Sequence, residues 1–238
     1  MRGPDTTHPA ARRAPAPLAW LPWILANTAS GALGGAAIDS LGLVGVILFG
    51  IIGGIAQWLV LRRYLHVTPR WAAATAVGNV LAWAVIPIYV NLGTFVFLLV
   101  LLAGSALQNA GIRVNVSFPS SFWLIAYYAI PPALGGAVSG AIVGQSQALV
   151  LRRQIEPATQ WVRASAAGGA VAGGVAGQDL FVRAISRTFP TLPGLAASAE
   201  GWPIYASGIA SGAVFGLAYG VITGIALVRL LHQRAPEE

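Results

Sequence analysis

Long apolar stretches follow one another along almost the whole chain. They cover residues 18–38, 41–61, 71–90, 92–110, 122–151, 161–178 and 202–231. A helix needs about 20 consecutive apolar residues to cross the hydrocarbon core of a bilayer. The strands of a transmembrane β-barrel would instead give short segments of alternating polarity. The pattern therefore predicts an all-α fold, a polytopic transmembrane helical bundle that fills residues 18–231 as a single domain.

Composition agrees with this prediction. Hydrophobic residues make up 56% of the chain and charged residues only 9%, whereas a soluble domain carries about 25% charged residues. Residues 1–17 are polar and rich in proline, which predicts a disordered cytoplasmic tail, and residues 232–238 form a second tail. We expect the first apolar stretch to remain as an uncleaved helix rather than to act as a cleaved signal peptide.

Two ten-residue segments are nearly identical. GIAQWLVLRR at 54–63 and GQSQALVLRR at 144–153 share seven positions, and Trp71 and Trp161 follow them at the same offset. Two kinds of helix alternate along the chain: one begins with tryptophan and continues with small residues, and the other is rich in glycine and ends in leucine, valine and arginine. The sequence predicts three tandem helical-hairpin repeats, at about 20–63, 71–153 and 161–231. The last hairpin is aligned by matching 220–231 with 140–151.

Arginines indicate the orientation of these helices. All 14 basic residues are arginine, and most of them either end a glycine-rich helix or precede a tryptophan-led one. Short basic loops stay in the cytoplasm, so both termini are expected there. The absence of lysine and the excess of alanine and glycine suggest a GC-rich bacterial genome, and therefore the bacterial cytoplasmic membrane.

One segment does not fit the simple repeat. Residues 91–108 are apolar enough to cross the membrane, yet they fall where the repeat predicts an external connection. If they cross, the chain must return through 118–133, which gives eight crossings, the interpretation that we favour. Otherwise 91–120 is a re-entrant or interfacial insertion in a bundle of six. The sequence therefore predicts about six to eight helices.

Glycines recur every four residues on three of the predicted helices. This spacing places them on one face of a helix, where small residues let two backbones approach closely in lipid. We expect these positions to pack helices within the chain, or between copies of it. They are Gly136, Gly140, Gly144, Gly169, Gly173, Gly177, Gly212, Gly216, Gly220 and Gly224.

Polar residues inside the predicted spans are the only candidates for a binding site. Gln57 and Gln147 recur five residues before the paired arginines, either as interhelical hydrogen bonds or as the lining for a solute or a lipid headgroup. Asn79 is expected to make a further hydrogen bond. Asp39 and Asp179 end two of the tryptophan-led helices, where we expect solvated carboxylates at the membrane interface. All five are weak candidates for binding.

No catalytic arrangement is found in the sequence. There is no cysteine, no paired carboxylate, no HExxH motif and no phosphate-binding loop, and the histidines fall in predicted tails or loops. The sequence therefore predicts no enzyme, no catalytic residue, no metal and no cofactor. The basic residues end helices rather than line a groove, so nucleic acid is not expected as a partner.

The motif QWLVLRR at 57–63, its copy QALVLRR at 147–153 and the W-x-x-A helix starts resemble an uncharacterised group of bacterial polytopic membrane proteins. That resemblance supports a membrane fold and implies no activity. Two functional hypotheses remain. The first is a non-catalytic accessory or scaffold subunit, or an assembly factor, whose partners are the lipid bilayer and other membrane subunits or a second copy. The second is a transporter or channel for a neutral or lipidic small molecule.

Overall fold

A computed structural model describes residues 19–110, 120–152, 158–177, 179–180, 183 and 207–233. The predicted tail at 1–17 and most of the tail at 232–238 lie outside these residues. The longer elements are all helical: α1 (Trp20–Leu41), α2 (Leu43–Leu61), α3 (Arg70–Asn109), α4 (Ser120–Leu151), α5 (Ala158–Ala172), the π-helical turn η2 (Gly173–Gly177) and α8 (Gly208–His232). No strand occurs in the described ranges.

Three of the described helices are long and apolar enough to cross a membrane. They are Leu43–Leu61, Ala129–Leu151 and Gly208–His232. They belong to α2, α4 and α8, the glycine-rich kind of helix in the sequence. Their exposed residues are mostly large and apolar, which suits contact with lipid rather than water. The chain is therefore an all-helical protein with the character of a membrane protein.

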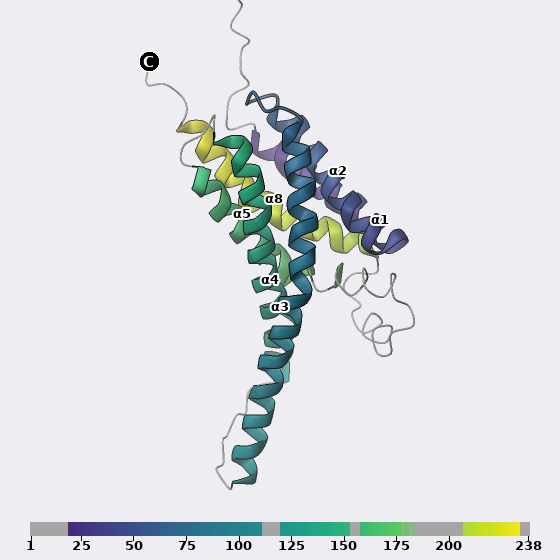
Figure 1. The fold of residues 1–238 in the computed structure, drawn as a ribbon, viewed down its shortest axis with the longest axis vertical. Helices are drawn as coiled ribbons and strands as arrows, with labels where there is room; N and C mark the ends of the chain where they lie inside the picture. The colour runs from purple at the N-terminus through teal and green to yellow at the C-terminus, as the bar shows by residue number, and fades with distance from the viewer. Residues whose placement is uncertain are drawn as a thin grey trace, which may run out of the picture.

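The helices close into a ring. Each packs against the next one along the chain, from α1 to α5 and then to α8, and α8 packs against α1. Figure 1 shows α8 returning beside α1 although the two are separated by most of the sequence. The starts of α1, α3 and α5 and the ends of α2, α4 and α8 lie at the same end of the bundle, which we call the arginine end.

The turn between α1 and α2 contains a single residue. Gly42 has a φ of 58°, a left-handed conformation that glycine adopts without steric cost, and its N–H donates to the Ile38 carbonyl. A side chain at this position would strain the backbone, so this glycine permits the tight reversal that pairs the first two helices.

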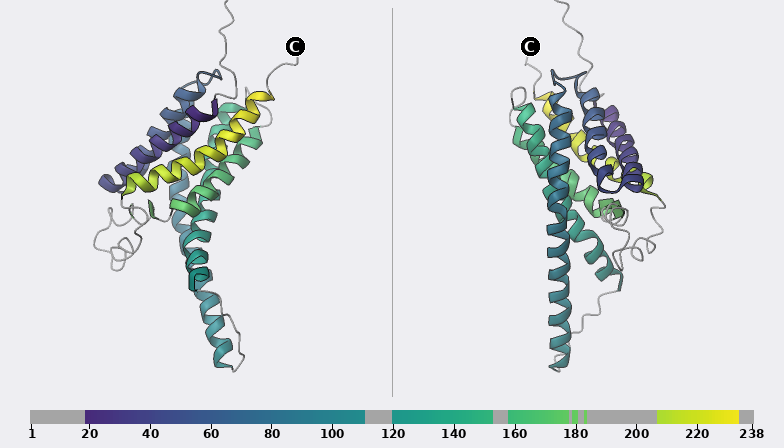
Figure 2. Two further views of the ribbon diagram at one scale, coloured as in Figure 1. Left: turned by 180° about the vertical axis from the view of Figure 1, so that it is seen from behind. Right: turned by 45° about the vertical axis from the view of Figure 1, so that its right-hand side comes forward.

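Helix α3 differs from the sequence prediction. It runs without a break from Arg70 to Asn109, so residues 91–108 continue the preceding helix and no turn separates the two segments. Forty residues at 1.5 Å each give a helix of about 60 Å, twice the thickness of a bilayer core. The expected break near residue 91 was wrong, and the number of membrane crossings stays a prediction. Figure 2 shows the distal part of α3 extending beyond the bundle.

Glycines bring neighbouring hairpins into backbone contact. A Cβ added at Gly31 of α1 or at Gly212 of α8 would overlap the carbonyl oxygen of the other residue. Gly136 of α4 and Gly169 of α5 oppose each other in the same way, and Gly54 of α2 lies against Ala72 of α3. These close interfaces, α8–α1, α4–α5 and α2–α3, therefore join each hairpin to the next one around the ring.

The other predicted packing glycines lie in the same interfaces. A Cβ at nine of the ten would come close to a neighbouring helix, whereas one at Gly177 would meet only Pro132 at 3.8 Å. The sequence analysis missed the partners on α1, Gly31 and Gly35, which oppose Gly212 and Gly208. Their spacing of four is the same signal that identified the others.

Candidate functional site

Three buried tryptophans meet at the arginine end of the bundle. Trp23 of α1, Trp71 of α3 and Trp161 of α5 are each fully buried. The rings of Trp23 and Trp161 meet edge to face with centroids 5.6 Å apart, and those of Trp71 and Trp161 are 5.8 Å apart. The Trp23 ring is part of the core because helix α8 packs against α1.

Each of these indoles donates a hydrogen bond to the helix of the neighbouring hairpin. Trp71 donates to Gln57 Oε1 at 3.3 Å, and Trp161 donates to Gln147 Oε1 at 2.9 Å. Trp23 donates to Thr223 Oγ1 at 2.9 Å. The three bonds cross the interfaces α2–α3, α4–α5 and α8–α1. The polar atoms and the glycine contacts therefore hold the same three interfaces.

The two glutamines also bond to each other. Gln147 Nε2 donates to Gln57 Oε1 at 3.0 Å and to Thr75 Oγ1 at 2.9 Å. Gln57 Nε2 donates to Asn27 Oδ1 at 2.8 Å. An amide oxygen accepts about two hydrogen bonds and an amide nitrogen donates two. Gln57 Oε1 and Gln147 Nε2 are therefore fully used by the protein itself.

The third position of the network, Thr223 at the α8–α1 interface, is built differently. Threonine has a shorter side chain than glutamine, and Thr223 donates to the Tyr219 carbonyl instead of reaching the next helix. Ser165, one turn after Trp161, has no hydrogen bond of acceptable geometry to a described residue, nor does the Tyr219 hydroxyl. Both hydroxyls are buried, so the third position lacks the bond between helices that the glutamine amides donate at the other two.

This arrangement determines what the candidate glutamines can do. Both are buried, with 4% and 0% of their surface exposed, and their bonds connect the helices from α1 to α5. Asn79 lies nearby on α3, and its side chain donates to the Thr75 carbonyl at 2.9 Å. The structure thus gives all three amides protein partners and brings Gln57 and Gln147 into direct contact.

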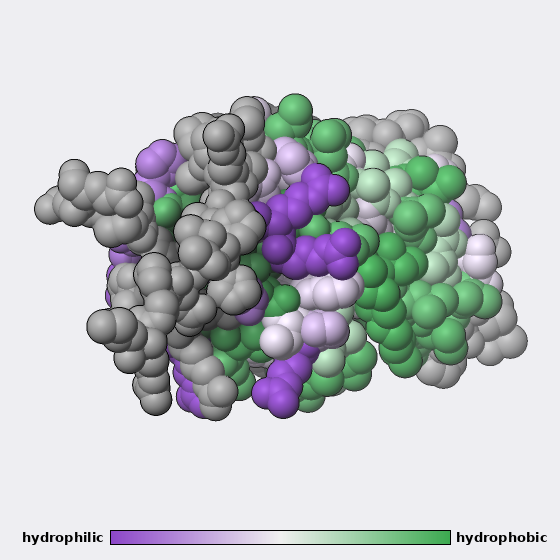
Figure 3. Space-filling model, turned by 90° about the horizontal axis from the view of Figure 1, so that it is seen from above, coloured by the Kyte–Doolittle hydropathy of each residue, from purple (hydrophilic) through white to green (hydrophobic). Residues whose placement is uncertain are grey.

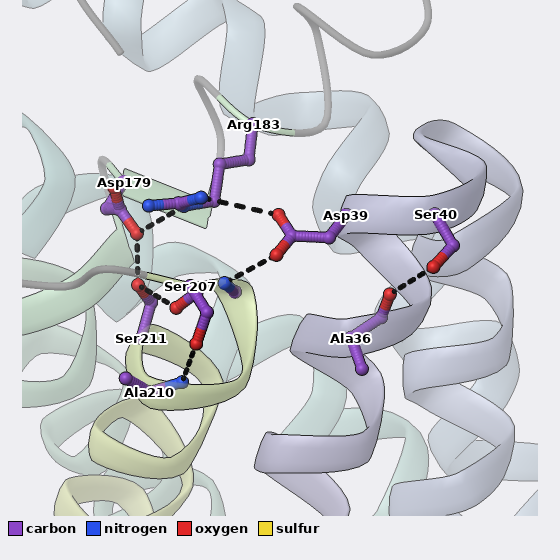
Figure 4. Close-up of polar contacts among 9 residues, drawn as sticks. Ala36, Asp39, Ser40, Asp179, Arg183, Ser207, Ala210 and Ser211 are labelled. Atoms are coloured by element: carbon purple, nitrogen blue, oxygen red, sulfur yellow. Dashed lines mark hydrogen bonds and ion pairs between the residues drawn. The ribbon is translucent and has the colours of Figure 1, made fainter. Parts of the chain in front are cut away.

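The two aspartates come together at the opposite end of the bundle. Arg183 donates from Nε to Asp179 Oδ2 at 2.8 Å and lies 3.4 Å from Asp39 Oδ1. Asp39 also accepts from the Gly208 N–H at 2.6 Å, and Ser211 donates to Asp179. Figure 4 shows Arg183 between the two carboxylates, with the first turn of α8 below them.

This cluster fixes the start of α8. A helix N-terminus carries unpaired N–H groups and a partial positive charge, so carboxylates stabilise it. Burial lowers the pKa of Arg183, but the hydrogen bonds and charges of Asp179 and Asp39 outweigh burial and raise the pKa above its ordinary value. The guanidinium therefore stays charged at every physiological pH.

The expectation of solvated aspartates was wrong. The side chains of Asp39 and Asp179 are only 23% and 14% exposed, because Arg183 and the first turn of α8 cover them. Sequence reasoning did not single out Arg183, which belongs to no repeat. Its spacing of four residues from Asp179 was a signal that could have identified an ion pair.

No protein-family model, curated protein or solved structure matches this chain.

Proposed function

We propose that this chain is a non-catalytic integral membrane protein, an accessory or scaffold subunit or an assembly factor of a membrane complex. The observation that carries the proposal is the hydrogen bonding of Gln57 and Gln147. These were the best candidates for a polar lining, and they bond to Asn27, Thr75, Trp71, Trp161 and each other. A solute would have to displace bonds that already hold the helices together.

The proposed architecture is three copies of one hairpin, α1–α2, α3–α4 and α5–α8, giving six crossings. Gln57, Gln147 and Thr223 each accept from a buried tryptophan, and each lies four residues before a buried leucine, Leu61, Leu151 or Leu227. In this alignment of the repeats, Gly220 corresponds to Gly144. The alignment is shifted by one helical turn from the sequence match of 220–231 with 140–151.

The charged residues support a role without chemistry in the membrane. Among the described residues the only carboxylates are Asp39 and Asp179, and both are paired with Arg183 at one end of the bundle. Ion-coupled pumps and proton relays usually place acids or bases within their spans. With the arginine-rich loops inside, we place both termini in the cytoplasm of a bacterial cell. We keep the resemblance to the bacterial polytopic group as part of this proposal.

The test begins with the unmodified protein, because replacing both glutamines would also loosen the bundle. The protein is purified gently from native membranes, and the proteins that accompany it are identified and quantified by mass spectrometry. The proposal predicts another membrane protein in a fixed stoichiometry. Recovery of this chain alone would contradict it.

A flux measurement tests the second hypothesis. The purified protein is reconstituted into vesicles, and the entry of glycerol or urea is followed by stopped-flow light scattering. We expect the rate of empty vesicles. A rate that rises with the amount of protein would favour a channel for neutral solutes and contradict the proposal.

A further inference from the structure

Exposed arginines surround one end of the bundle. Exposed arginines lie at the ends of five helices: Arg63 follows α2, Arg70 begins α3, Arg152 follows α4, Arg163 lies in the first turns of α5, and Arg229 lies in the last turns of α8. Arg62 is also exposed, and its guanidinium lies 5.2 Å from the centre of the Trp58 ring. Five of the six helices therefore present a cation at this end.

No carboxylate balances these charges among the described residues. The two described acids, Asp39 and Asp179, lie at the other end of the bundle and pair with Arg183. Figure 3 looks onto the arginine end and shows hydrophilic residues gathered on it, with hydrophobic residues beside them. The part of this surface that the structure describes is basic, so its charge suits an anionic partner.

The faces below the arginines show which kind of partner fits. On α2, the exposed Ile47, Ile51, Ile55 and Leu59 follow at intervals of four and end at Arg63. Residues four apart lie on the same face of a helix. The row turns by about 40° at each step, and Arg63 follows its last member, Leu59, just beyond the end of α2. The cation thus stands at the arginine end of a row of exposed apolar side chains.

The same arrangement occurs on two further helices. Leu217 and Ile225 precede Arg229 on α8, and Val171 of α5 and Val175 of η2 follow Arg163; these four apolar residues are all more than 40% exposed. A phospholipid presents an acyl chain and, above it, a phosphate group. Guanidinium groups bind phosphate through charge-assisted hydrogen bonds.

We propose that this collar of arginines binds the headgroup phosphates of anionic phospholipids, with the acyl chains along the apolar columns below. The cations are distributed around the bundle instead of on one side, so a ring of lipids matches them better than a single docked macromolecule. Basic residues next to a span are attracted to anionic lipid by about 1 kcal/mol each. The inference does not depend on the proposed scaffold function.

The test uses the full-length protein in phosphatidylcholine vesicles. Spin-labelled phosphatidylglycerol and spin-labelled phosphatidylcholine are added separately, and electron paramagnetic resonance measures the fraction of each probe immobilised by the protein. We expect the anionic probe to associate about fivefold more strongly than the zwitterionic one. Equal association of the two probes would overturn the proposal.

Two variants assign the preference to the collar. In R63Q/R229Q the preference should fall to less than half, whereas R63K/R229K keeps the charges and should retain most of it. An unchanged preference in the glutamine variant would overturn the assignment. Added salt tests the proposal without a substitution. At about 1 M the electrostatic screening length falls to about 3 Å, so the preference of the unmodified protein for the anionic probe should weaken. A preference that does not change with salt would also contradict the proposal.

Discussion

At the residue scale, Gln147 connects four helices through one side chain. From α4 it donates to Gln57 on α2 and Thr75 on α3, and it accepts from Trp161 on α5. A buried donor or acceptor that loses its partner costs free energy because no water replaces it. Gln147 is therefore the position where a single substitution should affect the largest number of helix interfaces.

Replacement of Gln147 by leucine should destabilise the bundle. Hydrogen bonds between membrane helices contribute about 0.6 kcal/mol each, so the loss of three bonds should cost about 2 kcal/mol. The midpoint of thermal unfolding in mild detergent measures the effect. Gln145 provides a matched control, because it is two residues away and exposed; equal midpoints for Q145L and Q147L would show that the network is not stabilising.

The third position of the network allows a test of compensation. Tyr219 packs against Gly168, as does Thr223, and the tyrosine occupies space that a glutamine at 223 would need. T223Q alone should therefore be overpacked and cost about 1–3 kcal/mol, and Y219V alone should leave a cavity. The double variant should be more stable than the sum of the two effects predicts, as measured in a double-mutant cycle. Additive effects would mean that the two positions are independent.

The residues of the polar network could be found only in part from the sequence. The glutamines stood out because they recur at one offset, and their two interpretations stayed open because a sequence does not show which groups face each other. The tryptophans were recognised as helix starts, but their burial depends on the neighbouring hairpin. Arg183 belongs to no repeat, so repetition could not identify it.

At the element scale, the glycines on α1 and α8 close the ring. The two helices stand at opposite ends of the sequence, and Gly31, Gly35, Gly208 and Gly212 let their backbones touch. The spacing of the glycines predicted close packing but not the partner helix, because any helix with glycines four residues apart can pack against any other such helix. The chain neighbours α2–α3 and α4–α5 also pack through glycines, and in the first hairpin Gly34 of α1 meets the side chain of Phe49 on α2.

Alanine scanning of glycines should separate close from open positions. G212A places a methyl group against the Gly31 backbone, so the helices must separate, at a cost of about 1–3 kcal/mol. Gly53 is the matched control, because the nearest atom to an added Cβ is Ser30 Oγ at 3.8 Å, and helical alanine is favoured over glycine. Unfolding midpoints should fall for G212A and stay level or rise for G53A; the reverse order would contradict the ring interface.

The long extension of α3 and α4 should be dispensable for the bundle. Where the structure describes burial between residues 83 and 134, no residue is buried, and Leu99, Leu102 and Leu107 are 49%, 64% and 41% exposed. Replacing residues 91–128 by a short glycine–serine linker should shift the unfolding midpoint by less than about 3 °C. A variant that no longer assembles would show that the extension is part of the fold.

At the scale of the whole molecule, the network, the glycine interfaces and the ion cluster give the same ring. Composition predicted the helical membrane character, because so few charged residues cannot cover a water-facing surface. The number of crossings could not be predicted in the same way, because residues 91–108 are apolar whether they cross a bilayer or extend a helix. The arrangement leaves the polar atoms of the interior facing one another, and this closed interior is the basis of the proposed scaffold function.

Cysteine accessibility tests the closed interior most directly, since the natural chain contains no cysteine. S165C introduces a nearly isosteric thiol at a fully buried position of the network, and T68C introduces one in the exposed loop between α2 and α3. Both variants are treated in membranes with a small water-soluble methanethiosulfonate reagent. We predict rapid modification of T68C and modification of S165C only after denaturation. Modification of S165C in the folded protein would reveal a water-accessible path through the bundle and contradict a closed, structural interior.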